Sequence, residues 1–183
     1  MKTNAVKISI FALFLLLSAM PLYAADGSRP GKFNIELSGG PGLEMGCTDR
    51  SGDFLLKSLL EFEKPISPRF SLGLRLLPIF LYEQQNKGDD TVWGAGFGLG
   101  LRFYFEKESY RGVYLEANTH ALGHKGQIEG NGSNLNFLSA FGVGYGFQNG
   151  MHTVLRYEHI SNAGLDRRNR GADAITLGLG FTF

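Results

Sequence analysis

The sequence predicts an eight-stranded antiparallel β-barrel that spans a membrane and follows a signal peptide. Three observations support this fold class. The 183 residues include 26 glycines and 15 phenylalanines, a pairing that disfavours helices and suits a pleated, half-buried surface. An apolar stretch opens the chain. Beyond it, apolar residues alternate with polar residues or glycines in eight segments, which is the pattern of strands with two different faces.

Composition and charge narrow the function classes. Lysine and arginine total 18 and aspartate and glutamate 17, for a net charge of +1. This balance argues against a nucleic-acid partner, which would require a strongly basic face. The single Cys47 excludes an intramolecular disulfide framework and any multi-cysteine metal site. We expect one domain, with no metal and no cofactor.

The first segment in chain order is a signal peptide. Lys2 and Lys7 form a short basic head, the residues from Ile8 to Met20 are nearly all apolar, and Ala24 and Ala25 supply small residues at the exit. A transmembrane anchor is the alternative, but the apolar run is shorter than the roughly 18–20 residues that a spanning helix needs. We therefore expect residues 1–24 to be a signal peptide and residues 25–183 to form the barrel.

The strand segments follow in order, and each sets apolar residues of one parity against polar residues or glycines of the other. In the first four, the apolar residues are Phe33, Ile35 and Leu37; Phe54, Leu56, Leu60 and Phe62; Phe70, Leu72, Leu74, Leu76, Phe80 and Tyr82; and Trp93, Ala95, Phe97, Leu99, Leu101, Phe103 and Phe105. In the last four, they are Val113, Leu115 and Ala117; Leu135, Phe137, Phe141, Val143, Tyr145 and Phe147; Leu155 and Tyr157; and Ile175, Leu177, Leu179, Phe181 and Phe183. Strands of this number and pattern predict a closed barrel.

The composition of the less apolar strand face indicates whether the barrel lies in water or in a membrane. It is largely glycine, with isolated charges at Arg75, Arg102, Glu116 and Arg156. Such a face would make a poor solvated surface, whereas in a lumen the glycines leave room for large polar side chains to pair. The other face carries aromatics along the strands, as a lipid-facing band does. A secreted lipocalin-like barrel is the alternative. The terminal Phe181-Thr182-Phe183 also resembles the aromatic C-terminal signature of bacterial outer-membrane barrels.

Connection lengths alternate and so predict the orientation. The short turns, residues 63–67, 106–111 and 148–150, would lie on the periplasmic side with both termini. The long loops, residues 39–52, 83–90, 122–133 and 162–170, would lie outside the cell.

Candidate chemistry is concentrated in the last hairpin. His159 and Ser161 share the parity of Leu155, and Asp173 shares that of Leu177. An antiparallel register that sets His159 opposite Asp173 brings their Cβ atoms to roughly 4.5–5.5 Å. Serine, imidazole and carboxylate can thus converge as an activated nucleophile, on the lipid-facing side near the outer rim. From the spacing alone, the alternative to a catalytic site is a set of ordinary polar residues at the barrel rim.

A resemblance bears on this choice. Residues 156–164 resemble the His-x-Ser-Asn-Ala-Gly signature of the lipid A 3-O-deacylase (PagL) family. The resemblance implies that Ser161 is the nucleophile, His159 the general base and Asp173 the acid that orients it, with an oxyanion hole from Asn162 and Gly164. The family pattern has glutamate where this chain has Asp173, so the shorter side chain must either draw the two strands closer or make a weaker contact with His159.

The resemblance also implies a substrate and a location. The substrate would be lipid A, the membrane part of lipopolysaccharide, cleaved at its 3-O-linked acyl ester in the outer leaflet of the outer membrane. Arg167, Arg168 and Arg170, together with Lys125, could bind its phosphates; a solvated charged loop without a ligand is the alternative. Two rivals remain: a non-catalytic small barrel of structural or adhesin-like kind, and an acyltransferase, which would hold an acyl donor in its lumen. Assembly is left open, with a homodimer as one option.

Overall fold

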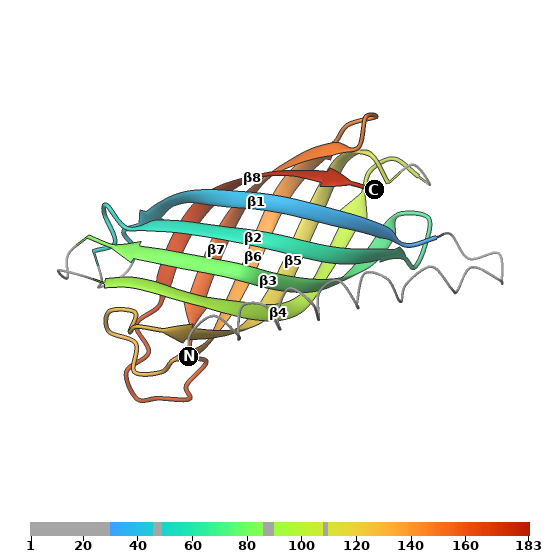
Figure 1. Cartoon of the computed structure of the whole chain (residues 1–183). Helices are drawn as coiled ribbons and strands as arrows, with labels where there is room; N and C mark the ends of the chain where they lie inside the picture. The colour runs from blue at the N-terminus through green and yellow to red at the C-terminus, as the bar shows by residue number, and fades with distance from the viewer. Residues whose placement is uncertain (1–29, 46–48, 86–89, 108–109) are drawn as a thin grey trace, which may run out of the picture. The chain divides into compact units, whose positions relative to one another are not determined.

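A computed structural model of the chain describes residues 30–45, 49–85, 90–107 and 110–183. The predicted signal peptide and Cys47 lie outside these ranges. Eight antiparallel strands close into a barrel in which each strand pairs with its neighbours in sequence and the last with the first (Figure 1). The strands are β1 (Lys32–Leu43), β2 (Phe54–Pro65), β3 (Phe70–Gln84), β4 (Asp90–Tyr104), β5 (Gly112–Lys125), β6 (Leu135–Gly146), β7 (Met151–Ser161) and β8 (Ala172–Thr182). The predicted fold class is confirmed.

The barrel has two different rims. The start of β1 and the end of β8 lie at one rim with the ends of β2, β4 and β6; we call it the terminal rim. The ends of β1, β3, β5 and β7 lie at the other, the loop rim. The predicted alternation of short and long connections holds except between β3 and β4, where five residues separate the strands against seven between β4 and β5.

The outer wall of the barrel is apolar. Leucine, isoleucine, valine and phenylalanine side chains alternate outward along the strands, as Leu37, Phe97 and Leu179 illustrate. Near the terminal rim aromatic rings pair on this wall, with centroids 5.1 Å apart for Phe70–Phe103 and 5.0 Å for Phe181–Phe183. An outward apolar band with aromatic residues at its edge is the lipid-facing surface of an outer-membrane barrel. Among the described residues, no helix is long and apolar enough to cross a membrane.

A network of buried charges fills much of the interior. Glu116 on β5 accepts hydrogen bonds from Arg75 at 2.6 Å, Arg102 at 2.9 Å and Arg156 at 2.7 Å. These four residues are the ones predicted to pair in the lumen, and the prediction is confirmed. Pairing is required here because an uncompensated buried charge is strongly destabilising.

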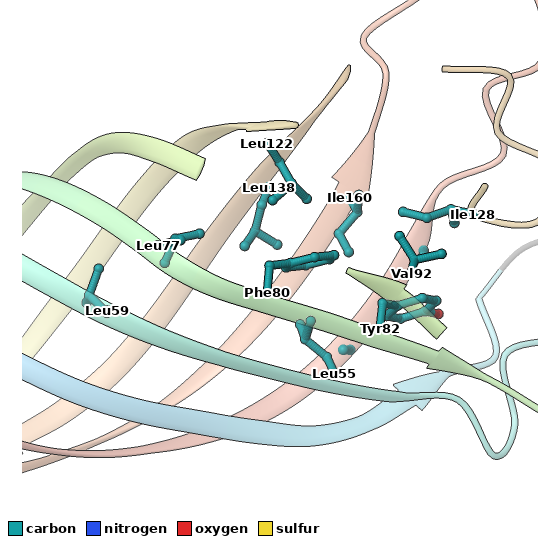
Figure 2. Packing of buried hydrophobic residues seen from close by; sticks show 12 residues of the cluster. Leu55, Leu59, Leu77, Phe80, Tyr82, Val92, Leu122, Ile128, Leu138 and Ile160 are labelled. Carbon is teal, nitrogen blue, oxygen red and sulfur yellow. The ribbon is translucent and has the colours of Figure 1, made fainter. Parts of the chain in front are cut away.

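An apolar cluster occupies the interior beneath the loops, and sequence analysis did not predict it. Figure 2 shows most of its side chains, among them Phe80, Leu138 and Ile160, gathered inside the wall of strands, with Leu59 further along β2. Its members are Leu55, Leu59, Leu77, Phe80, Tyr82, Val92, Leu122, Ile128, Leu138, Ile160, Ala172 and Ala174. The prediction that Phe80 and Tyr82 share the outward face of Phe70 is wrong, since both are fully buried.

A β-bulge in β3 explains the error. The pairing of β3 with β4 shifts between Leu77 and Phe80, and both Pro78 and Ile79 point outward in succession. The extra residue reverses the parity of the rest of the strand, so Phe80 turns inward. Proline has no N–H to donate to the sheet and is found in strands at such bulges.

Candidate active site

His159 and Asp173 meet across the β7–β8 hairpin. They are register partners, and the His159 Nδ1 atom lies 2.8 Å from Asp173 Oδ1. The His159 side chain is 44% exposed and the Asp173 side chain only 11%. A covered carboxylate bound to one ring nitrogen fixes the orientation of the imidazole and leaves Nε2 as the nitrogen that can exchange a proton.

Tyr157 is a third member of this group that sequence analysis placed only in the apolar band. It precedes His159 by two residues and so points outward from the same strand. Its hydroxyl donates to Asp173 Oδ1 at 2.5 Å, the same oxygen that contacts His159. The short aspartate is thus held by two neighbours on β7. The signal that could have identified Tyr157 was its polar tip, diagonal to Asp173 on the predicted face.

Ser161 ends β7 at the loop rim. It pairs with Phe137 of β6 and has the outward parity of Leu155 and Tyr157, with a half-buried side chain. No hydrogen bond joins Ser161 to His159 within the described residues. The two side chains therefore share a strand, a face and a rim without direct contact. Hydrogen bonds between nucleophile and base are often long until substrate is bound.

Gly171 makes room for the imidazole. A Cβ atom at this position would lie 2.6 Å from His159 Cε1, closer than non-bonded atoms approach, and 3.3 Å from the Ile160 carbonyl oxygen. A side chain at residue 171 would therefore displace the ring. This close approach depends on the β7–β8 register, so no local sequence pattern reveals it.

Asn162 organises the loop that follows Ser161. It is fully buried, and its side-chain amide donates to Asn131 Oδ1 at 3.0 Å and to the Arg168 carbonyl at 2.8 Å. Its backbone N–H donates to Asn169 Oδ1 at 2.8 Å. Every N–H of Asn162 is therefore used to tie the 162–171 loop to itself and to the 126–134 loop.

Asn162 to Leu165 form a tight turn. The Leu165 N–H donates to the Asn162 carbonyl at 3.0 Å, and the central residues Ala163 and Gly164 both have positive φ, at 51° and 85°, as in a type I′ turn. A positive φ is unfavourable for alanine, and such strain often marks functional segments. The Gly164 N–H donates to Asn162 Oδ1 at 2.9 Å. The Ala163 N–H, in contrast, donates to no atom of the described residues.

The three predicted arginines gather in the same loop. Arg167, Arg168 and Arg170, with Gly130 and Asn169, line a surface hollow of about 490 Å³. All three side chains are exposed, and Arg168 lies 3.9 Å from the Asp166 carboxylate. The arrangement presents guanidinium groups to one hollow, which suits an anion such as phosphate.

The remaining histidines lie apart from this group. His120 and His152 are buried inward, and His124 contacts Asn136 at 2.6 Å. His124, predicted in a loop, lies within β5. Among the described residues, no three His, Cys, Asp or Glu side chains lie close enough together to hold a metal ion.

The fold and this group of residues define a class: an outer-membrane β-barrel that carries a candidate hydrolytic site on its wall. Residues 56–182 match the family described as "Lipid A 3-O-deacylase (PagL)". The match spans most of the chain, and the protein belongs to this family. A comparison with curated proteins gives no match.

The fold is also that of a solved structure. The crystal structure of Neisserial surface protein A (NspA) superposes with a TM-score of 0.56 and 11% identity, covering 86% of this chain and all, 100%, of that one. The outer membrane protein OprG from Pseudomonas aeruginosa gives a TM-score of 0.45 and 13% identity over 86% of this chain and 98% of that one. At such identities the likeness to NspA shows the barrel alone. Barrel and family together place the protein in the Gram-negative outer membrane.

Proposed function

We propose that this protein is a lipid A 3-O-deacylase that acts as a serine esterase on the outside of its own barrel. One observation carries the proposal: the His159–Asp173 pair stands on the same outward face and at the same rim as Ser161, in a chain of the lipid A 3-O-deacylase family. The chain would reach the outer membrane by export, with residues 1–24 removed.

In the proposed mechanism, Ser161 Oγ attacks the carbonyl carbon of the 3-O-linked acyl ester while His159 Nε2 takes the hydroxyl proton. The tetrahedral intermediate collapses as the bond from the carbonyl carbon to the sugar oxygen breaks, and the imidazolium returns the proton to that oxygen. Water then attacks the acyl-enzyme with the same base, releasing the fatty acid and restoring Ser161. Asp173 holds the ring and stabilises the imidazolium, and Tyr157 holds Asp173.

The oxyanion would form beside the 162–164 turn. Asn162 and Gly164 are the proposed oxyanion-hole residues, but their N–H groups donate within the protein as the loop stands. The Ala163 N–H donates to no atom of the described residues and belongs to a residue with positive φ, so we infer that it is the donor that an oxyanion could use without rearranging the loop. Asn162 and Gly164 would then act by fixing the turn that presents it.

The position of the site suits the substrate. The ester bonds of lipid A lie where sugar meets acyl chain, so a membrane-embedded enzyme needs its nucleophile on the outer wall near the headgroup level. The loop rim would face the cell exterior, and Arg167, Arg168 and Arg170 would bind lipid A phosphates. Polar groups are tolerated there, because a charge on the lipid face costs only about 0–1 kcal/mol near the interface.

Mass spectrometry of lipid A from cells that make the protein tests the proposal. We expect loss of one hydroxyacyl chain with the wild-type protein and no change with Ser161→Ala, which should still fold into a heat-modifiable barrel because an outward rim serine contributes little packing. Unchanged lipid A with folded wild-type protein would favour a non-catalytic barrel. Gain of an acyl chain would favour an acyltransferase. Deacylation by folded Ser161→Ala protein would contradict the serine mechanism.

A further inference from the structure

A groove crosses the outer wall of β3, β4 and β5 near the loop rim. Its volume is about 530 Å³, within the range of ligand sites. The lining is mostly apolar and comprises Pro78, Ile79, Phe80, Leu81, Trp93, Gly94, Ala95, Gly123, His124 and Lys125. None of these residues belongs to the candidate active site.

Small residues form the floor of the groove. Ala95 on β4 and Gly123 on β5 are register partners, and both point outward. A Cβ atom at Gly123 would meet no atom within 4 Å, so nothing in the barrel fills the space above this glycine. The flanks are large: Ile79, which the β3 bulge turns outward beside Pro78, is 52% exposed and Trp93 is 55% exposed. Neighbouring side chains thus leave a furrow above these small residues.

A positive charge stands at the end of the groove. Lys125 is the last residue of β5, exposed at the loop rim, and it pairs in register with Trp93. Tryptophan and lysine are residues that anchor at membrane interfaces, with the lysine amine at headgroup level. An apolar furrow that ends at an ammonium group matches a lipid chain attached to an anionic headgroup.

The groove lies on the same wall as Ser161. In register, Gly123 pairs with Leu135 of β6, and Phe137, two residues further along β6, pairs with Ser161. Only β6 separates β5 from β7, so the two strands lie about 10 Å apart around the wall at roughly 4.8 Å per strand. Lipid A carries several acyl chains on one phosphorylated disaccharide, so one molecule can span this distance.

We propose that this groove binds an acyl chain of lipid A that is not cleaved, with Lys125 pairing with a headgroup phosphate. The choice of lipid A as the ligand rests on the proposed function. The groove and its positive charge are observed independently of that function. The groove would hold the substrate by a second chain while another chain presents its ester to Ser161.

Trp93 provides a direct measurement because it is the chain's single tryptophan. Purified Ser161→Ala protein in detergent micelles containing brominated phosphatidylcholine would have its Trp93 fluorescence quenched by brominated chains in the groove. Added lipid A should displace them and restore fluorescence, whereas phosphatidylglycerol at equal charge should restore it only at higher concentration. Equal restoration by phosphatidylglycerol would overturn the assignment to lipid A.

Two variants test the groove itself. Gly123→Leu fills the furrow without a steric clash or positive φ, and we expect it to abolish the restoration by lipid A. Lys125→Gln should raise the lipid A concentration for half-restoration about five-fold, the effect of one exposed ion pair near 1 kcal/mol. Ala117→Leu, outward on the same strand but nearer the terminal rim, is the matched control and should behave as the parent. Wild-type restoration in Gly123→Leu would overturn the proposal.

The fluorescence measurement is separate from catalysis, because the Ser161→Ala background performs none. Should lipid A restore fluorescence while wild-type protein fails to deacylate it, the groove proposal stands and the proposed function fails. If the wild-type protein deacylates lipid A but lipid A does not restore fluorescence, the proposed function stands and the groove proposal fails. In the active protein, Gly123→Leu should raise KM for lipid A and leave kcat for a short soluble ester unchanged.

Discussion

At the scale of single residues, Asp173 is the position where this chain departs from its family's pattern. The resemblance of residues 156–164 to the family's signature implies a glutamate there, and an aspartate has a shorter reach. The structure shows how the shorter side chain still reaches the imidazole: direct register pairing places Asp173 opposite His159, and the Tyr157 hydroxyl donates to the same carboxylate oxygen. The contact of 2.8 Å is that of an ordinary charge-assisted hydrogen bond.

Asp173→Asn should lower the deacylation rate by orders of magnitude, because an amide neither stabilises the imidazolium nor enforces the correct tautomer. Asp173→Glu should retain activity, with the longer side chain displacing the Tyr157 hydroxyl from its present place. The measurement is lipid A deacylation by refolded protein in detergent. Wild-type rates in both Asp173→Asn and Asp173→Ala would show that the acid is a bystander and leave a Ser–His dyad.

Gly171→Ala should lower kcat about ten-fold or more, since a methyl group there must push the His159 ring from its position. Gly146→Ala is the matched control: its Cβ would meet no atom closer than 3.4 Å, it lies at the terminal rim away from the site, and its activity should be unchanged. Steady-state kinetics of lipid A deacylation by both variants measures this effect, with folding checked by heat-modifiability. Equal activity in the two variants would show that the ring position is not critical.

At the scale of elements, the β7–β8 hairpin could be predicted from the sequence, whereas the effect of the β3 bulge was not predicted. The β7–β8 register followed from parity and loop length, so the His159–Asp173 contact could be anticipated. Parity failed in β3, where Pro78 and Ile79 insert an extra residue. Pro78 was a readable signal for that bulge. The buried state of Asn162 was not readable, because it depends on contacts with Asn131 and Arg168 that are set by how two loops pack.

Asn162→Ala should disorder the 162–171 loop and reduce activity strongly, because it removes three side-chain hydrogen bonds at a buried residue and leaves their partners unsatisfied. The barrel itself should survive, since no strand hydrogen bond depends on that amide. Limited proteolysis should report cleavage in the 162–171 loop of the variant and protection in the wild type. A protected loop in an inactive variant would instead indicate a direct role of the Asn162 side chain in the reaction.

At the scale of the whole molecule, the barrel has its charges inside and its apolar surface outside. Sequence alternation predicted this inversion and named four of the charged residues that pair within. It did not predict the apolar cluster beneath the loops, because four of that cluster's members come from the β3 bulge region or a loop: Leu77, Phe80, Tyr82 and Ile128.

Glu116→Gln should destabilise the barrel by about 3–5 kcal/mol, since it removes the shared partner of three buried arginines. Activity per folded molecule should stay unchanged, because Glu116 lies inside the barrel and the candidate site outside. Unfolding in denaturant measures the first effect and lipid A deacylation the second. Stability equal to wild type would mean that the arginines find other partners.

The filled interior has a consequence for the cell that makes this protein. Arginine–glutamate pairs occupy the middle of the barrel, and Phe80 and its apolar neighbours close it beneath the loops. We therefore expect small solutes and antibiotics to gain no route through it, unlike the water-filled channel of a porin. A bacterium could carry many copies of this protein and remodel its surface lipid while its permeability barrier stays intact.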